Sequence, residues 1–226
     1  MRPRLILLRH GVTEWNREGR FQGHRDPPLA GDGLLEARLL GARMAADPAE
    51  RPPRIVTSTL DRASQTASAV ADVLAGSGTR PELEEDARLM EVGQGEWEGR
   101  THRELAESDA GRYRAWRSQA HSQPPGSEPL EQVRTRVASL LDEVASAGEG
   151  PVCLVSHGGT LRIMASLLLG LDEEHFWSMD LDNCSLSAFA PQGETSWTLE
   201  RWNDTAHLLG RTEQHVDESD GEPLAL

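Results

Sequence analysis

Three short apolar segments have the pattern of strands that are buried on both faces. Residues 5–8 read Leu-Ile-Leu-Leu, residues 54–58 contain a β-branched Ile-Val-Thr run, and residues 151–156 contain Val-Cys-Leu-Val. Continuous apolar runs of this length, without polar alternation, are typical of parallel strands in α/β proteins. Two further β-like stretches, residues 186–190 and 196–202, are predicted to be edge strands.

Each of the three segments is followed by a stretch with helical periodicity, and a fourth such stretch precedes the third segment. Apolar positions recur every three or four residues in residues 33–46, 61–74, 131–147 and 160–169, and the last stretch is apolar nearly all round. Strands that alternate with helices predict an α/β fold of the three-layer sandwich type, with a mainly parallel central sheet and helices on both faces.

The length of 226 residues suits one domain, which we expect to span residues 1–210. Residues 93–129 do not fit the alternation of strands and helices. They contain Trp97, Tyr113, Trp116 and a Pro-Pro-Gly turn, and we interpret them as an insertion that forms a lid over the C-terminal edge of the sheet. Residues 211–226 are acidic and lack an apolar face, so a disordered tail is expected there.

The composition excludes several classes of function. The formal net charge of −14 argues against nucleic-acid or anionic-membrane partners, because both would be repelled at long range. The chain has no lysine, since all 23 residues counted as Lys or Arg are arginine, and this excludes a Schiff-base or P-loop lysine. The two cysteines form no disulfide framework, and the apolar part of the N-terminus is too short for a signal peptide. A cytoplasmic location is therefore expected.

The predicted parallel strands end in reactive polar residues. The first ends in Arg9-His10-Gly11, the second leads into a helix that carries Arg62, and the third ends in His157-Gly158. Ligands of open parallel sheets bind beyond the carboxyl ends of the strands, so these residues should converge at one edge. Arginine forks match phosphoryl oxygens, and helix starts add free N–H groups. The convergence predicts a phosphate site.

Catalysis at such a site requires a nucleophile and a proton donor. A neutral imidazole is a competent nucleophile toward phosphorus, and arginine and histidine donors can stabilise the transferring group. A leaving alkoxide needs a proton, for which a carboxylic acid at the rim is the usual source. Glu91 follows a short apolar stretch and precedes the proposed lid, and it is the candidate.

Several ordered blocks of the chain resemble signatures of the histidine phosphatase superfamily, also called the phosphoglycerate-mutase-like family. The most specific is Arg9-His10-Gly11-Val12-Thr13-Glu14-Trp15-Asn16, which is similar to the family's Arg-His-Gly-x-Thr-x-x-Asn. The other blocks lie within residues 21–29, 58–67, 91–99, 125–128, 156–162 and 203–207. The Pro-Gly-Ser-Glu block at 125–128 departs from the family's Pro-Gly-Gly-Glu-Ser turn. The resemblance covers residues 4 to 208.

The resemblance implies roles for individual residues. His10 would be the phosphorylated nucleophile, and Glu91 would protonate the leaving group and then activate water. Phosphate binding would fall to the side chains and backbone of Arg9, Arg62, His157, Asn16 and Gly158. Gln22 and Gly23 either contact the substrate or simply form a turn. Neither a metal nor a cofactor is implied.

The sequence leaves the reaction and the substrate open. The first hypothesis is a phosphatase acting on a small phosphomonoester, and the second is a phosphoglycerate mutase. The acid loop, residues 93–100, lacks the lysine of the mutases and is more similar to the broad-specificity and α-ribazole phosphatase branch. A third hypothesis is an inactive phosphate-ligand sensor, against which the intact set of reactive residues argues. Edge strands and apolar helix faces are compatible with a homodimer without fixing one.

Overall fold

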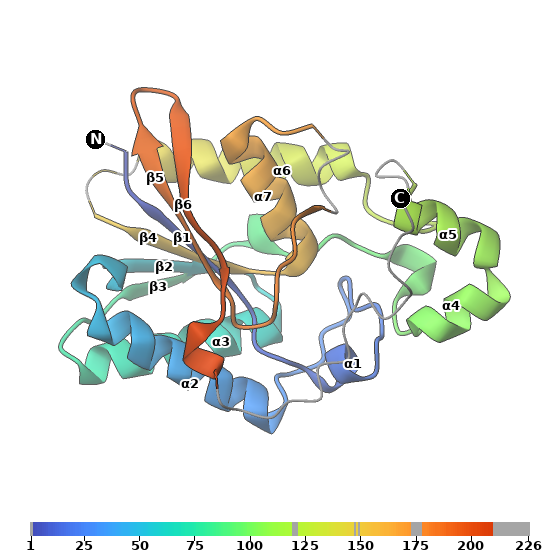
Figure 1. Ribbon diagram of the computed structural model, residues 1–226, viewed down its shortest axis with the longest axis horizontal. Helices are drawn as coiled ribbons and strands as arrows, with labels where there is room; N and C mark the ends of the chain where they lie inside the picture. Colours follow the sequence, from blue (N-terminus) through green and yellow to red (C-terminus); the bar gives the residue numbers. More distant parts are fainter. Residues whose placement is uncertain (1, 119–121, 147, 149, 173–177, 210–226) are drawn as a thin grey trace.

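The computed structural model describes residues 2–118, 122–146, 148, 150–172 and 178–209. Its described residues form a six-stranded sheet in the order β3-β2-β4-β1-β5-β6 (Figure 1). The strands are β1 (Leu5–Arg9), β2 (Arg54–Thr57), β3 (Glu82–Glu85), β4 (Val152–Ser156), β5 (Leu186–Gln192) and β6 (Ser196–Asp204). The first four are mutually parallel neighbours, and β5 pairs antiparallel with both β1 and β6.

Helices cover both faces of the sheet, as the sequence predicted (Figure 1). One face packs against α2 (Gly31–Ala46) and α3 (Asp61–Gly76), and the other packs against α6 (Leu130–Ser146) and α7 (Gly158–Leu169). Alternate residues of β1 enter the two cores: Leu5 and Leu7 contact the α6 and α7 side, while Ile6 and Leu8 contact the α2 and α3 side. This double burial explains why β1 is apolar at each of these positions.

The described residues of the insertion, 93–118 and 122–129, lie beyond the carboxyl ends of the parallel strands (Figure 1). They contain α4 (His102–Ser108) and α5 (Ala110–Ser118), together with a 3₁₀ turn at Gly95–Trp97. A separate aromatic core holds this insertion, in which Phe21 of the main domain meets Trp97, Tyr113 and Trp116. The predicted tail, residues 211–226, lies outside the described residues.

One strand, β3, and one helix outside the insertion were not predicted from the sequence, nor were α4 and α5 within it. The strand β3 lies at the edge of the sheet and is largely exposed. Its four residues, Glu-Leu-Glu-Glu, therefore contain no apolar run that could have identified it. The short helix α1 (Glu14–Arg17) arises from a capping box between Thr13 and Asn16, which is a local signal without hydrophobic periodicity. Further 3₁₀ turns lie at Pro48–Glu50, Ala87–Leu89 and Ala206–Leu208.

The prediction that residues 186–190 form an edge strand was wrong. They belong to β5, which lies between β1 and β6, and β6 forms the edge. The inner half of β5 is buried because it continues the sheet from β1 in antiparallel register, with Leu8 opposite Leu186.

Among the described residues, the structure contains no helix with the length and hydrophobicity needed to cross a lipid bilayer.

Shortening a leucine in the central strand β4 is expected to destabilise the fold. Leu154 is 0% exposed and contacts the α6 and α7 core, so Leu154→Ala should lower the free energy of unfolding by about 2–5 kcal/mol. Leu83 of β3 is 41% exposed, and Leu83→Ala should change it by less than about 1 kcal/mol. Urea unfolding measures both variants. Equal losses would contradict the assignment of β4 to the core.

Candidate active site

The structure brings Arg9, His10, Arg62 and His157 together at the carboxyl edge of the sheet. His10 follows β1, Arg62 lies in the first turn of α3, and His157 links β4 to α7. All four are buried, with exposures of 6%, 2%, 0% and 0%. The pairing of β1 with β4 continues past the strand end, where the His10 N–H donates to the Ser156 carbonyl, and the two imidazole centroids are 5.1 Å apart.

The His10 ring is held in one orientation by its own turn. Its Nδ1 lies 2.7 Å from the Gly11 carbonyl oxygen, and since a carbonyl can only accept, Nδ1 carries the proton. The Nε2 atom therefore presents its lone pair. Burial, followed by the charges of Arg62 and Arg9, holds the pKa of His10 well below 6.5, so the ring is neutral at neutral pH.

His157 and Arg62 form a second fixed unit. The Arg62 Nε donates to His157 Nδ1 at 3.1 Å, so that nitrogen is unprotonated and Nε2 donates to the Ser58 hydroxyl at 2.8 Å. Burial is the largest of the effects that hold the pKa of His157 well below 6.5, and the charge of Arg62 comes next. The Arg62 guanidinium also donates to the carbonyls of Gly23 and Arg25 at 2.9 and 2.8 Å. Burial lowers the pKa of Arg62 to about 10, which leaves it charged at neutral pH.

Two more guanidinium groups meet at the start of α7. A Cβ atom at Gly158 would lie 3.5 Å from Nη1 of Arg162 and 3.6 Å from Cζ of Arg9. Arg9 is anchored by a hydrogen bond to the Leu181 carbonyl, and Arg162 Nε donates to the Met179 carbonyl at 2.7 Å. The first N–H groups of a helix have no partner within the helix. Together these groups can bind the oxygens of a phosphoryl group.

Glu91 reaches the same helix start from the opposite side. Its carboxylate accepts hydrogen bonds from the N–H groups of Gly159 at 3.1 Å and Thr160 at 3.0 Å. A Cβ atom at Gly159 would lie 2.8 Å from Glu91 Oε1, so glycine is needed there for the carboxylate to approach. The proposed acid is thus bound to the N–H groups two and three residues after His157.

The remaining predicted residues lie around this cluster. Asn16 is the third residue of α1 and completes the capping box with Thr13, and its Oδ1 is 3.4 Å from Nδ2 of Asn183. Gln22 is buried, and Gly23, with a φ of +51°, supplies a carbonyl to Arg62. A Cβ atom at Gly23 would lie 2.2 Å from Oε1 of Glu98, so the position requires glycine. Gly23 therefore has a structural task, whether or not it contacts a substrate.

Sequence reasoning did not select Ser58, Arg162 or Asn183 for the site. The Asn183 side chain donates to the His10 carbonyl at 3.0 Å and lies near the His10 ring, with Nδ2 3.5 Å from Nδ1. The sequence could have pointed to Asn183 through its place just before β5. An antiparallel strand begins at the edge of the sheet where its parallel neighbours end, which is the edge that carries the site.

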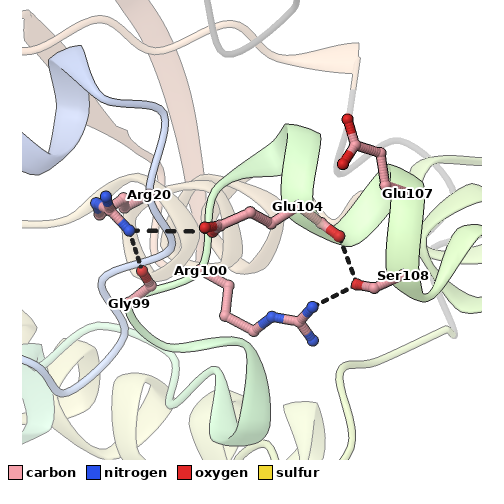
Figure 2. Close-up of a pocket in the computed structure, with 6 residues that line it drawn as sticks. All are labelled: Arg20, Gly99, Arg100, Glu104, Glu107 and Ser108. Carbon is pink, nitrogen blue, oxygen red and sulfur yellow. Dashed lines mark hydrogen bonds and ion pairs between the residues drawn. The ribbon is translucent and has the colours of Figure 1, made fainter.

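A cavity of about 500 Å³ lies between Arg20 and residues of the insertion (Figure 2). Its walls carry both charges, and Arg20 bonds to the Gly99 carbonyl while Arg100 bonds to Ser108. The lining residues are Arg20, Gly99, Arg100, Glu104, Glu107 and Ser108, of which none belongs to the phosphate cluster. Across the described ranges, no three His, Cys, Asp or Glu side chains gather as metal ligands.

The chain belongs to the histidine phosphatase superfamily (branch 1), whose family model matches residues 5–205. This confirms the family inferred from the motifs. Phosphoserine phosphatase 1 of Hydrogenobacter thermophilus is 33% identical over 91% of this chain and 94% of its own length. Glucosyl-3-phosphoglycerate phosphatase of Mycolicibacterium vanbaalenii is also 33% identical, over 91% and 96%. A protein of Yersinia enterocolitica named probable phosphoglycerate mutase is 33% identical over 90% and 94%.

Solved structures with the same fold include phosphatases. A mycobacterial glucosyl-3-phosphoglycerate phosphatase in complex with VO3 has a TM-score of 0.79, 31% identity and coverage of 90% of this chain and 99% of its own. The α-ribazole phosphatase of Shigella flexneri has a TM-score of 0.74, 29% identity and coverage of 89% and 96%. The relatives support phosphatase activity for this chain.

The ionisation of His10 should differ from that of an ordinary histidine. Because its pKa lies well below 6.5, His10 should stay neutral as the pH falls through 6.5 and gain a proton only at more acidic pH. An NMR titration of the ring nitrogens, assigned with His10→Asn, measures this directly and avoids the titration of substrate phosphate near pH 6. A midpoint at 6.5 or above would refute the assigned environment.

Proposed function

We propose that this protein is a phosphomonoesterase that hydrolyses a small phosphorylated metabolite through a phosphohistidine intermediate on His10. The observation that carries the proposal is the state of His10. Its Nδ1–H is bound to the Gly11 carbonyl, and burial together with the nearby charges of Arg62 and Arg9 depresses its pKa, so Nε2 keeps its lone pair. A neutral imidazole in an anion site combines substrate affinity with nucleophilicity.

The first chemical step transfers the phosphoryl group to the enzyme. The lone pair of His10 Nε2 forms the N–P bond while the bond from phosphorus to the leaving oxygen breaks. The protonated Glu91 carboxyl gives its proton to that oxygen, so an alcohol departs. Arg9 and Arg62 bind the transferring oxygens, together with the N–H of Gly158. His157 binds them when its Nε2–H exchanges the Ser58 hydroxyl for a phosphoryl oxygen, and Asn16 supports the site through Asn183.

The second step returns the enzyme to its starting state. The Glu91 carboxylate accepts a proton from water, the water oxygen bonds to phosphorus, and the N–P bond breaks. Inorganic phosphate leaves, and His10 Nε2 recovers its lone pair. In this scheme the guanidinium groups supply the positive charge that Mg²⁺ provides in many other phosphoryl-transfer enzymes, so no metal is required.

A mutase is the second candidate, favoured by the relative that carries that name. A mutase must hold its substrate while the phosphohistidine returns its phosphoryl group to another hydroxyl. Arg100, the basic residue of the acid loop, donates a hydrogen bond to the Ser108 hydroxyl and lines the separate cavity, so it is not placed to hold a mutase substrate. Water is therefore the acceptor that we favour.

Removing the nucleophile should abolish turnover while leaving phosphate binding intact. Chelator-treated protein is expected to hydrolyse p-nitrophenyl phosphate, and His10→Ala should reduce kcat by on the order of 10⁴-fold or more. Calorimetry with inorganic phosphate should still detect binding in the variant, which controls for folding.

Two outcomes would overturn this proposal. Rapid isomerisation of 3-phosphoglycerate with little phosphate release would establish the mutase. Phosphate binding without either activity, on a panel of phosphorylated metabolites, would establish the sensor.

A further inference from the structure

The backbone that carries Glu91 is fixed by side chains at every carbonyl from residue 88 to residue 91. Two of these donors, Ser156 and Thr160, flank the His157 turn, while Arg136 lies on α6 and His24 in the loop between α1 and α2. The four carbonyls and their donors are Arg88 with Arg136 Nη1 at 2.7 Å, Leu89 with Ser156 Oγ at 2.6 Å, Met90 with Thr160 Oγ1 at 2.7 Å, and Glu91 with Arg136 Nη2 at 3.2 Å and His24 Nε2 at 2.9 Å. We call residues 88–91 the acid segment.

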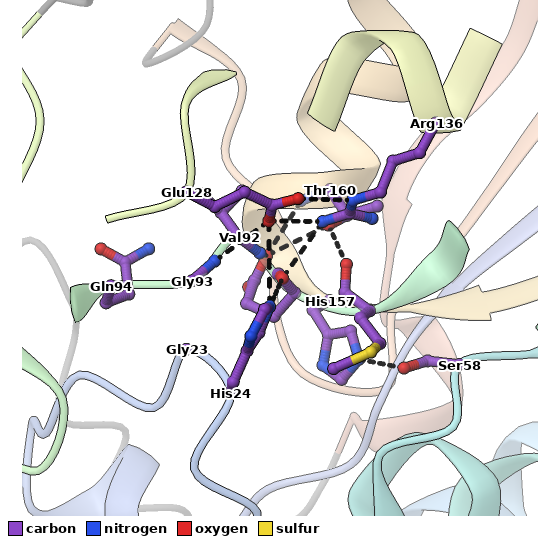
Figure 3. A network of polar contacts seen from close by, with 12 residues as sticks. Gly23, His24, Ser58, Val92, Gly93, Gln94, Glu128, Arg136, His157 and Thr160 are labelled. Atoms are coloured by element: carbon purple, nitrogen blue, oxygen red, sulfur yellow. Dashed lines mark hydrogen bonds and ion pairs between the residues drawn. The ribbon is translucent and has the colours of Figure 1, made fainter. Parts of the chain in front are cut away.

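Arg136 is the only one of these donors that holds two carbonyls of the acid segment in the described structure. Its guanidinium is itself held by Glu128, with Nε 2.9 Å from Oε1 and Nη2 3.0 Å from Oε2 (Figure 3). Both side chains are mostly buried, at 17% and 18% exposure. Such a bidentate pair fixes the plane of the guanidinium.

Glu128 also makes hydrogen bonds with the backbone two residues after Glu91. Its Oε2 accepts from the Gly93 N–H at 3.3 Å, and its own N–H donates to the Gly93 carbonyl at 2.9 Å. The pair of Arg136 and Glu128 therefore contacts the backbone before, at and after Glu91. Although burial raises the pKa of Glu128, the hydrogen bonds and charge of Arg136 lower it below its ordinary value, which keeps the pair ionised.

The carboxyl end of Glu91 is held differently from its backbone. As a carboxylate it accepts from the N–H groups of Gly159 and Thr160. A protonated carboxyl is a weaker acceptor than a carboxylate, so this hold is reduced in the acid form. The bonds from Arg136 to backbone carbonyls do not depend on the protonation of Glu91, and they can keep it in place in both forms.

We propose that Arg136 and Glu128 are positioning residues that hold Glu91 where it exchanges protons with the leaving oxygen and with water. This inference rests on the proposed function of Glu91. The pair does not contact the phosphate cluster through any hydrogen bond described here, so its loss should affect proton transfer and spare phosphoryl binding. A loss of proton transfer can be told from a loss of phosphoryl binding by comparing a substrate whose leaving group needs a proton with one whose leaving group does not.

The test compares two phosphate esters in Arg136→Gln and Glu128→Gln. The value of kcat/KM reports steps up to transfer of the phosphoryl group, and p-nitrophenolate can leave without a proton, whereas an alkyl phosphate cannot. We expect kcat/KM for the alkyl ester to fall by roughly 10²-fold, a typical cost of misplacing a catalytic group, while kcat/KM for p-nitrophenyl phosphate changes by less than about threefold. Arg134→Gln, on the same helix, is the matched control and should leave both unchanged.

The second step supplies an independent readout. With p-nitrophenyl phosphate, slower hydrolysis of phosphohistidine should lower kcat and KM together, and a burst of p-nitrophenol approaching one equivalent should appear before the steady state. Arg136→Lys keeps the charge without the fork and should give a smaller loss than Arg136→Gln.

Three results would overturn the inference. Equal losses for both esters would mean that the pair only supports the fold, and unchanged values for both would mean that Glu91 does not need it. If wild-type protein hydrolyses both esters but forms no phosphohistidine, the proposed function fails and this inference falls with it. If wild-type protein forms phosphohistidine and only the selective loss is missing, the proposed function stands without it.

Discussion

The parallel pairing of β1 with β4 is the contact on which the site depends. These strands come from residues 5–9 and 152–156, and their register sets Arg9 directly opposite Ser156. The next residue on each strand is a histidine, so one ladder of backbone hydrogen bonds places two imidazoles side by side. The turn of β2 into α3 then adds Arg62 from the other side of β4.

Burial of the charged groups in the pocket costs free energy, and the same burial keeps the His10 ring neutral. Guanidinium groups lose hydration inside the protein, and here Arg62 is compensated largely by neutral carbonyls and His157. Burial, followed by the charges of the nearby guanidinium groups, lowers the pKa of both histidines, which keeps His10 neutral. In the proposed reaction a phosphoryl group would supply the missing negative charge. A strongly acidic chain, with a net charge of −14, thus contains a locally cationic site.

Much of the fold and the centre of the site could be predicted from the sequence. Apolar runs identified β1, β2 and β4 because these strands are buried on both faces, and the residues just after them were correctly expected to meet. The acidic strand β3 could not be predicted, since its pairing with β2 and the ion pair of Arg54 with Glu84 exist only in the folded sheet. Asn183 and Arg136 were missed for a related reason. They act on His10 and Glu91 from distant segments, and neither belongs to a motif with the spacing of a site.

In the proposed reaction, His10 attacks phosphorus through Nε2 because its Nδ1–H donates to the Gly11 carbonyl. The most direct test is to quench the reacting enzyme in alkali, isolate the phosphorylated peptide and determine the phosphohistidine isomer by NMR. We expect a phosphoryl group on Nε2 of His10. A phosphoryl group on Nδ1, on another residue, or on none during turnover would contradict it.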